Sequence, residues 1–297
     1  TPMAFVASER GSIVGVYDLT DPAAPVLKQL LPSGVSPEGM VAIPGRNLFV
    51  TANEVDFVED GGVRAHVMIY ALAEGAPAYP MITSEGTPEL LGWGALSGLA
   101  ADPAEAGRLY AVSDSIYGQM PMIYTIDATQ TPARITGGLP VTRGGDAAQK
   151  LDLEGIAADG EGGFWLASEG RSDRLIPHAI YRVDDKGEIR EEIALPPELA
   201  ANEIRFGFEG IAVAGDWLWM AVQREWKDDP AGMVKLVGYN TADKTWGAVH
   251  YPLDALPEGA SDAAFMGLSE ITVSGDWVYL IERDNQIGAA AATKRIY

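Results

Sequence analysis

The sequence contains no cysteine, only three histidines, and half as many basic as acidic residues: 21 Lys and Arg against 42 Asp and Glu in 297 residues. Without cysteine there can be no disulfide framework, thiolate zinc site, iron–sulfur cluster or cysteine nucleophile. The absence also suits an oxidising compartment. The net charge of −21 repels phosphate backbones and anionic lipid. We therefore expect neither nucleic acid nor a membrane surface as a partner.

Long hydrophobic runs and familiar catalytic motifs are missing as well. The longest apolar stretch, residues 211–222, is interrupted by Asp216, so we expect a chain that does not span a membrane. No G-x-S-x-G elbow, H-E-x-x-H, P-loop or G-x-G-x-x-G occurs, so no organic cofactor is expected. No apolar leader precedes Phe5, and we expect a trimmed piece of a longer chain.

What the sequence does contain is a repeat. Five segments align: PEGMVAIPGRNLFVTANE, LSGLAADPAEAGRLYAVSD, LEGIAADGEGGFWLASE, FEGIAVAGDWLWMAVQRE and LSEITVSGDWVYLIERD. Their equivalent positions recur every 55 to 60 residues and are Glu38, Ser97, Glu154, Glu209 and Ser269. In each unit a short strand of small and β-branched residues runs into a turn of Gly, Asp, Asn or Pro, and a strand rich in aromatic residues follows. This period is typical of a four-stranded propeller blade.

The repeat predicts an all-β fold, a β-propeller of four-stranded blades forming a single domain over residues 1–297. The chain would contribute strands to six blades, and the full ring has room for a seventh. Residues 1–32 would supply all but the inner strand of one blade, and residues 268–297 all but the outer strand of another. Because a propeller closes its ring to avoid bare edges, we expect a further segment or chain to complete it. The tryptophans Trp165, Trp226, Trp246 and Trp277 are expected to pack between blades.

Acidic residues recur at the strand ends of the repeat. In a hairpin, the start of the first strand and the end of the second lie together, so the sequence predicts an acidic collar at one mouth of the central channel. Crowded carboxylates cannot all stay ionised without a cation, and oxygen-only ligands favour Ca²⁺ before Mg²⁺. The collar has these members: Glu9, Glu38 with Glu54, Ser97 with Asp114, Glu154 with Glu169, Glu209 with Glu225, and Glu270 with Glu282 and Asp284. The predicted metal ligands are Glu38, Glu54, Glu154, Glu169, Glu209, Glu270 and Glu282.

A second interpretation of the same acids stays open. A strand-end glutamate that only caps backbone N–H groups of the neighbouring blade would also recur once per repeat. Four arginines lie within two residues of these acids: Arg10, Arg171, Arg224 and Arg283. They would either bind phosphate or carboxylate oxygens in a bidentate manner or neutralise the collar through ion pairs. The predicted catalytic residues are Glu154, Glu209, Arg171, Arg224 and Arg283.

Three strings carry a family resemblance: LEGIAADGEGGFWLASEGR, FGFEGIAV and LSEITVSGDWVYLIERDNQIG. They resemble the phytase-like family, described as "esterase-like activity of phytase". Residues 9–54, which open ERGSIVGVYDLTDP, are similar to choice-of-anchor I surface proteins and to related chains classed as alkaline phosphatases. The resemblance implies a secreted or surface-attached propeller with metal-dependent phosphoesterase activity, and it adds Arg205 to the candidate residues.

Together these observations favour an enzyme, a Ca²⁺-dependent phosphoric-ester hydrolase acting on a small phosphate or carboxylate ester. We expect it in the periplasm, secreted or at the cell surface. Two alternatives remain. One is a non-catalytic surface propeller that binds a partner and holds structural Ca²⁺. The other is a Ca²⁺-dependent lactonase or carboxylesterase, because the fold alone does not decide the reaction.

Overall fold

The structure is a computed structural model that describes residues 2–60, 64–75, 82–115, 118–203, 205–286 and 291–297. The chain separates into two compact units. The N-terminal unit comprises Thr1–Thr83, Gln130–Ala133 and Gln286–Ala291, and the C-terminal unit comprises Ser84–Thr129, Arg134–Asn285 and Ala292–Tyr297. The single domain expected over residues 1–297 stays a prediction.

The N-terminal unit holds two three-stranded antiparallel sheets, in the orders β1-β2-β3 and β4-β5-β6. Their strands are β1 (Met3–Ser8), β2 (Ile13–Asp18), β3 (Val26–Pro32), β4 (Pro37–Ile43), β5 (Leu48–Asn53) and β6 (His66–Ala71). Shorter elements of this unit are η1 (Pro44–Arg46), η2 (Val58–Asp60) and the two-residue strand β7 (Ile82–Thr83). The first sheet has three strands, as the phase of the repeat predicts for residues 1–32.

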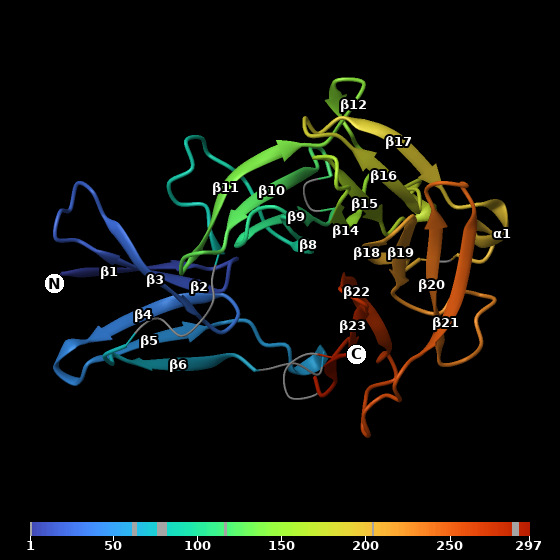
Figure 1. Ribbon diagram of the computed structural model, residues 1–297. Coiled ribbons are helices and arrows are strands. Elements are labelled where there is room, and N and C mark those ends of the chain that lie inside the picture. The colour runs from blue at the N-terminus through green and yellow to red at the C-terminus, as the bar shows by residue number, and fades with distance from the viewer. Residues whose placement is uncertain (1, 61–63, 76–81, 116–117, 204, 287–290) are drawn as a thin grey trace. The chain divides into compact units, whose positions relative to one another are not determined.

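The C-terminal unit contains four antiparallel sheets that follow one another along the chain (Figure 1). The first has β8 (Leu96–Ala101), β9 (Arg108–Ser113), β10 (Met122–Asp127) and β11 (Ala133–Pro140). The second has β14 (Leu153–Ala158), β15 (Phe164–Ser168), β16 (Ala179–Val183) and β17 (Ile189–Ala194). The third has β18 (Phe208–Ala214), β19 (Trp217–Val222), β20 (Met233–Asn240) and β21 (Trp246–Pro252). The last has β22 (Met266–Ser274), β23 (Trp277–Asp284) and β24 (Lys294–Ile296).

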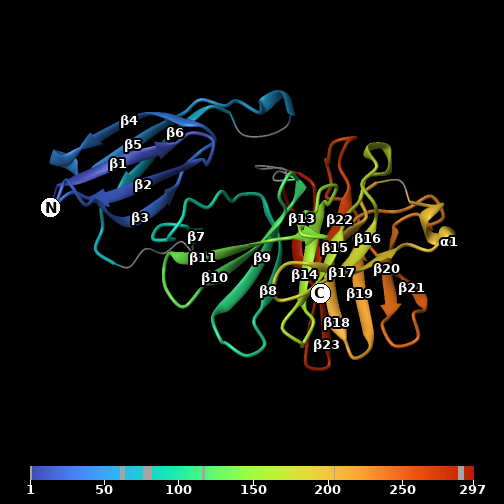
Figure 2. The ribbon, with the colours of Figure 1, turned by 90° about the horizontal axis from the view of Figure 1, so that it is seen from above.

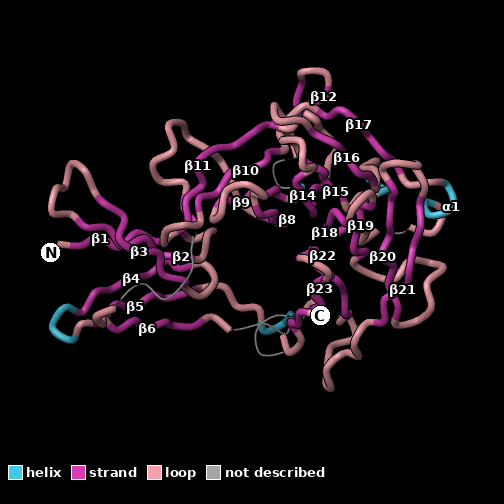
Figure 3. The backbone as a smooth tube through the Cα atoms, in the orientation of Figure 1, coloured by secondary structure: helices cyan, strands magenta, loops and turns pink. Residues whose placement is uncertain are grey.

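Little else is regular in this unit, as the tube in Figure 3 shows. The remaining elements are the hairpin β12 (Thr142–Arg143) and β13 (Asp146–Ala147), the short η4 (Ser172–Arg174) and the helix α1 (Pro197–Ala200). Across the described residues, no helix is long and apolar enough to cross a membrane. The all-β prediction is confirmed.

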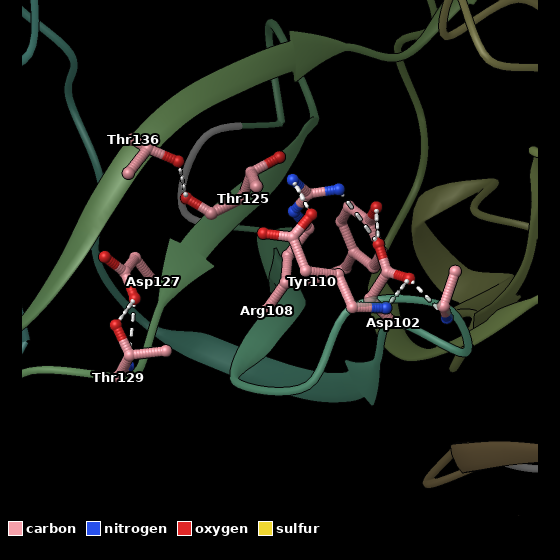
Figure 4. Close-up of polar contacts among 9 residues, drawn as sticks. Asp102, Arg108, Tyr110, Thr125, Asp127, Thr129 and Thr136 are labelled. Atoms are coloured by element: carbon pink, nitrogen blue, oxygen red, sulfur yellow. Dashed lines mark hydrogen bonds and ion pairs between the residues drawn. The ribbon is translucent and has the colours of Figure 1, made fainter.

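Turn chemistry explains why adjacent strands of one sheet pair. Asp102 directly follows β8, and its carboxylate accepts hydrogen bonds from the Tyr110 hydroxyl (2.6 Å), the Ala104 N–H (2.8 Å) and the Glu105 N–H (3.0 Å) (Figure 4). These bonds, that of Tyr110 above all, lower the pKa of Asp102 to about 2. The carboxylate thus fixes the loop and the start of β9 together.

The four sheets are arranged as propeller blades. Their first strands β8, β14, β18 and β22 lie side by side in chain order, and β11, β17 and β21 lie on the outside (Figures 1 and 2). Three core clusters fill the space between neighbouring sheets. Leu153 and Leu166 belong to the cluster between the first and second sheets, Phe208 to the next, and Leu268 to the last. The predicted blade architecture is therefore confirmed in this unit.

The tryptophans follow the prediction with one exception. Trp165 and Trp226 are buried between the second and third sheets, and Trp246 packs against the same cluster. Trp277, by contrast, is 70% exposed at the start of β23. It lies on the last sheet of the chain, and none of the three core clusters includes it. Its expected packing between blades is wrong.

Glycines let the first strands approach one another closely. A Cβ on Gly98 would lie 2.9 Å from the carbonyl oxygen of Glu154, and one on Gly155 would lie 2.8 Å from the backbone of Gly210. A Cβ on Gly210 would in turn lie 2.7 Å from the backbone nitrogen of Ile271. These separations are too short for any side chain, and the obstacle is backbone that cannot rotate away. The glycine after each of these repeat positions therefore sets the spacing of the blades.

Candidate functional site

The five repeat positions share one structural feature, a β-bulge in the first strand of a sheet. In each case the residue is skipped by the strand pairing: Glu38, Ser97, Glu154, Glu209 and Ser269. Bulges leave the extra residue unpaired, redirect its side chain and occur often beside active sites. The repeat seen in the sequence is thus a repeat of bulges, and each one presents a side chain at the same place in its blade.

A second equivalent position follows the second strand in four of the sheets and lies within β23 in the fifth. The residue before each bulge pairs with the residue that precedes this position. The five equivalents are Glu54, Asp114, Glu169, Gln223 and Arg283. The sequence predicts Glu225 opposite Glu209, and this alignment is wrong by two residues. Glu225 is exposed and accepts a hydrogen bond from the Gly232 N–H at 2.5 Å.

Neighbouring blades are linked by a hydrogen bond between two bulge residues. The Ser97 hydroxyl donates to the carboxylate of Glu154. Burial, opposed in part by this bond and assisted by the charges of Glu209, Glu169 and Asp152, raises the pKa of Glu154 to about 9. Ser97, at the second bulge of the chain, is therefore hydrogen-bonded to Glu154, at the third.

Glu209 and Gln223 form a buried pair within the third sheet. Glu209 is 8% exposed and Gln223 is 7% exposed. The Gln223 side-chain amide donates to the Glu209 carboxylate, while the amide oxygen Oε1 has no hydrogen-bond partner among the described residues. Burial, followed by the charge of Glu169, raises the pKa of Glu209 to about 8. Gln223 was not predicted from the sequence; its place directly after β19, matching Glu169 after β15, is the signal that could have found it.

Glu169 and Asp152 complete the carboxylate cluster of the C-terminal unit. The Glu169 N–H donates to the Asp152 carbonyl oxygen at 2.8 Å, and Asp152 is 7% exposed. Burial and the charge of Asp152 raise the pKa of Glu169 to about 7. Burial also raises the pKa of Asp152. We call Asp152, Glu154, Glu169 and Glu209 together with Gln223 the carboxylate site, and Asp152 was not among the predicted residues.

Two further predicted ligands are engaged elsewhere. The Glu282 carboxylate is fully buried and accepts hydrogen bonds from the Tyr251 hydroxyl at 2.9 Å and the Asp254 N–H at 2.5 Å. Glu270 lies beside Gly210 and accepts a hydrogen bond from the Ile271 N–H at 2.9 Å. Burial raises the pKa of Glu270 to about 8, although that bond and one from the Leu99 backbone oppose the shift. Both carboxylates cap backbone groups, as the alternative interpretation supposed.

Arginines surround the carboxylate site. The charge of Arg283 lowers the pKa of Glu209, and the charges of Arg205 and Arg171 lower that of Glu169. Arg283 Nε donates to the Ser269 hydroxyl at 2.7 Å, and Arg171 Nε lies 3.1 Å from the Asp173 carboxylate. The fixed positive charges are too few to offset burial, because the pKa values of the glutamates remain raised.

The N-terminal unit holds its own acidic group. One carboxylate oxygen from each of Glu9, Glu38 and Glu54 lies within 4.8 Å of the others. Glu38 and Glu54 are exposed, and Arg10 Nε lies 3.3 Å from Glu9. The two predicted ligands Glu38 and Glu54 thus lie near each other, in a different unit from the carboxylate site.

The fold and the site together define a class of protein. The chain has propeller blades, and the bulged inner strands of these blades carry buried carboxylates flanked by arginines. The family described as "Phytase-like: Esterase-like activity of phytase" matches residues 91–297. The chain belongs to this phytase-like family. The similarity of residues 9–54 to surface-anchored and alkaline phosphatase proteins stays a prediction.

No curated protein matches the chain. Among solved structures it is similar to Kuenenia stuttgartiensis hydrazine synthase, at 13% identity over 95% of this chain and 72% of that one, with a TM-score of 0.37. Sqt1 from Saccharomyces cerevisiae shares 10% identity over 99% and 70% of the two chains, also with a TM-score of 0.37. A luciferin-regenerating enzyme shares 11% identity over 87% and 75%, with a TM-score of 0.34. Similarities at this level do not bear on function.

Proposed function

We propose that the chain is an ester hydrolase whose carboxylate site holds a hard divalent cation, Ca²⁺ before Mg²⁺, and that it acts on small phosphate esters. Membership of the phytase-like family supports the hydrolase class. One observation carries the proposal of a cation. The Gln223 amide oxygen is buried without a partner among the described residues, beside glutamates whose pKa values lie far above their ordinary 4.5.

The donor atoms of the carboxylate site are of the kind that such a cation takes, although its three glutamates do not bring their oxygens within 4.8 Å of one another, as Glu9, Glu38 and Glu54 do. Glu154, Glu169, Glu209 and the Gln223 oxygen offer only oxygen donors, which is the set that Ca²⁺ prefers. Burial penalises the charged form of each glutamate, and each charge penalises the others. A bound dication would allow all three to ionise and would give the orphaned amide oxygen a partner. Capping alone explains Glu282 and Glu270, but it does not explain an unpartnered oxygen.

A bound cation would supply Lewis-acid polarisation of a phosphoryl oxygen and a lowered pKa of water. The chain would provide the remaining chemistry. Arg171 and Arg283 carry planar guanidinium groups suited to phosphate oxygens. Without a cation, Glu154 and Glu209 have pKa values of about 9 and 8 and hold their protons near neutral pH, and binding of the cation would displace those protons. Ser97 would hold Glu154 in place through its hydrogen bond.

A substrate screen tests the reaction class. We would assay p-nitrophenyl phosphate, p-nitrophenyl acetate and a γ-lactone in Ca²⁺ and in EGTA, using wild type, Glu209→Gln and the control Glu198→Gln. Glu198 is exposed on α1. We expect Ca²⁺-dependent hydrolysis of the phosphate ester that is lost in Glu209→Gln and kept in Glu198→Gln. Hydrolysis of only the acetate or lactone would establish the esterase alternative. No turnover together with Ca²⁺ binding would establish the non-catalytic one.

We also propose that the protein works outside the cytoplasm, in the periplasm, secreted or at the cell surface, with a small ester as its partner. The absence of cysteine and the net charge of −21 support this placement. Cell fractionation checks it directly, and native protein in the cytoplasm would overturn it.

A further inference from the structure

A cavity of about 510 Å³ lies in the C-terminal unit. Its walls come from the loop before β18, the loop after β19 and the segment that leads to β22. They include Arg205, Phe206, Arg224, Leu253, Phe265 and Met266. A volume of this size suits a small organic molecule, and walls that are mostly apolar with a few polar groups are typical of such sites.

Arg224 lies against two neighbouring aromatic rings, whose centres are 6.0 Å apart. Its guanidinium carbon lies 4.7 Å from the ring centre of Phe206 and 4.0 Å from that of Phe265. Arg205 stacks on Phe206 as well, at 4.5 Å. Stacking covers the flat faces of a guanidinium group but leaves the N–H groups at its edge able to donate. Within the described part of the chain, the contacts of these two arginines are with the aromatic rings, and neither has a hydrogen bond or ion pair.

The two acids that border the cavity are already engaged. Glu225 accepts the Gly232 N–H at 2.5 Å. Asp254 pairs with Arg295 and accepts the Tyr297 hydroxyl at 2.5 Å. Because Asp254 is paired with Arg295, the lining carries the charges of Arg205 and Arg224 against that of Glu225, in a chain of net charge −21. A site of this polarity would attract an anion that the rest of the surface repels.

The cavity adjoins the carboxylate site through the backbone. Gly207, directly after Phe206, accepts a hydrogen bond from the N–H of Gln223, directly before Arg224, at 2.8 Å. Phe206 has φ of +61°, a left-handed conformation that is strained for a non-glycine residue. Its ring nevertheless contacts both arginines. The same loop therefore positions a ligand of the cation and a wall of the cavity.

We propose that the cavity binds a small amphipathic organic anion, a single phosphate or carboxylate group attached to an aromatic or aliphatic body. Arg224 and Arg205 bind the anionic group, and Phe206, Phe265 and Leu253 contact the body. The inference deepens the proposed hydrolase, on which it rests for the claim that this anion is substrate or product. Polyphosphates are disfavoured, because apolar walls offer no partners for their further charges.

Calorimetric titration tests the proposal without turnover. The probes are phenylphosphonate, methylphosphonate, inorganic phosphate and phenylacetate, each in Ca²⁺ and in EGTA. We expect phenylphosphonate or phenylacetate to bind wild type at least tenfold more tightly than methylphosphonate or inorganic phosphate, and the preferred aryl anion identifies the anionic group. Binding that persists in EGTA supports this cavity even if the metal-dependent hydrolase fails. Equal binding of all probes, or no binding in either buffer, would overturn it.

Variants locate the binding. Arg224→Met keeps most of the side-chain length beside the rings but removes the positive charge. We expect this variant to bind the preferred aryl anion at least tenfold more weakly than wild type. Phe265→Leu should remove most of the preference for phenyl over methyl while retaining the anion. Arg190→Met is the matched control, because Arg190 pairs with Asp184 at the surface. If Arg224→Met does not fold, Phe265→Leu decides, and an unchanged phenyl preference in that variant would contradict the proposal.

Discussion

The side-chain amide of Gln223 donates to the carboxylate of Glu209, and this bond joins the two repeat positions of one blade. Glu209 occupies the bulge of β18, and Gln223 directly follows β19. Because the amide nitrogen is used in this pair, only the oxygen remains for a ligand. Glutamine at this position offers a neutral oxygen as a ligand, whereas Glu169 offers a charged oxygen at the equivalent position of the preceding blade.

Gln223→Leu should weaken Ca²⁺ binding by about tenfold or more, because it removes one oxygen donor and the partner of Glu209. In excess Ca²⁺, at about 100 times the wild-type Kd, the wild-type midpoint should rise by about 5–10 °C, and the variant should lose about half of that rise or more. Thermal melts in Ca²⁺ and EGTA measure this. Gln149→Leu is the control, because Gln149 is exposed. A full Ca²⁺ response in Gln223→Leu would remove the amide from the site.

Stability without metal should fall as the pH rises. The folded-state pKa values of Glu169, Glu209 and Glu154 are about 7, 8 and 9, against an ordinary 4.5. Between pH 5 and pH 9 the folded chain therefore binds more protons than the unfolded chain, so its free energy of unfolding decreases with pH. We expect the midpoint in EGTA to drop by about 5 °C or more over this window.

Glu154→Gln should flatten that dependence, because the neutral amide has no charge to bury. Ca²⁺ should flatten it in wild type, because the ionised glutamates then have a partner. Melting curves at pH 5, 7 and 9 in both buffers decide this. A wild-type midpoint that rises with pH in EGTA would show that the carboxylates are not buried against one another.

Gly155→Ala should destabilise the C-terminal unit by about 1–3 kcal/mol, as overpacking does in cores. Its new Cβ would lie 2.8 Å from the backbone of Gly210, where no side chain can move aside. Gly137→Ala is the control, since nothing lies within 4 Å of a Cβ there. Urea unfolding measures both, and equal stability of the two variants would contradict the close approach of β14 and β18.

Asp102→Asn should reduce the acid sensitivity of the protein. The pKa of Asp102 is lowered from 3.8 to about 2, so its stabilisation is present above pH 4 and is lost as the pH falls toward 2. The variant should be less stable than wild type at pH 6, and the gap should close at pH 2. The exposed turn residue Asp216 gives the control, Asp216→Asn. A gap that persists at pH 2 would show that the charge of Asp102 is not what matters.

Much of the fold could be predicted from the sequence because the repeat reflects the packing of one sheet against the next. Each unit buries one strand face against the next sheet, so the same small, β-branched and aromatic residues recur, as Leu153 and Phe208 illustrate. Trp277 shows the limit of such a prediction. A residue type that is buried between the second and third sheets lies exposed at the start of β23, so the residue type alone does not decide burial.

The site could be predicted only in part. Glu154, Glu169 and Glu209 could be found from their recurrence. Gln223 could be found only from its place directly after a strand, and Asp152 could not be found, because an extra carboxylate does not repeat. The two-residue misalignment at Glu225 has a similar cause. The bulges leave unequal numbers of residues unpaired on the two strands, two on β8 against one on β9 and one against none in the other sheets. Counting along the chain therefore does not reveal which positions face each other across a hairpin.

The bulges of β8, β14, β18 and β22 also bear on how such a site can change. Their geometry is similar whether the skipped residue is Glu or Ser, since the pairing resumes at the glycine, leucine or Glu270 beyond it. One side chain can therefore be exchanged in one blade without disturbing the strands of its neighbours. The blades thus provide a set of backbone positions at which the side chain can vary. New combinations of ligands can arise there by point substitution while the fold is unchanged.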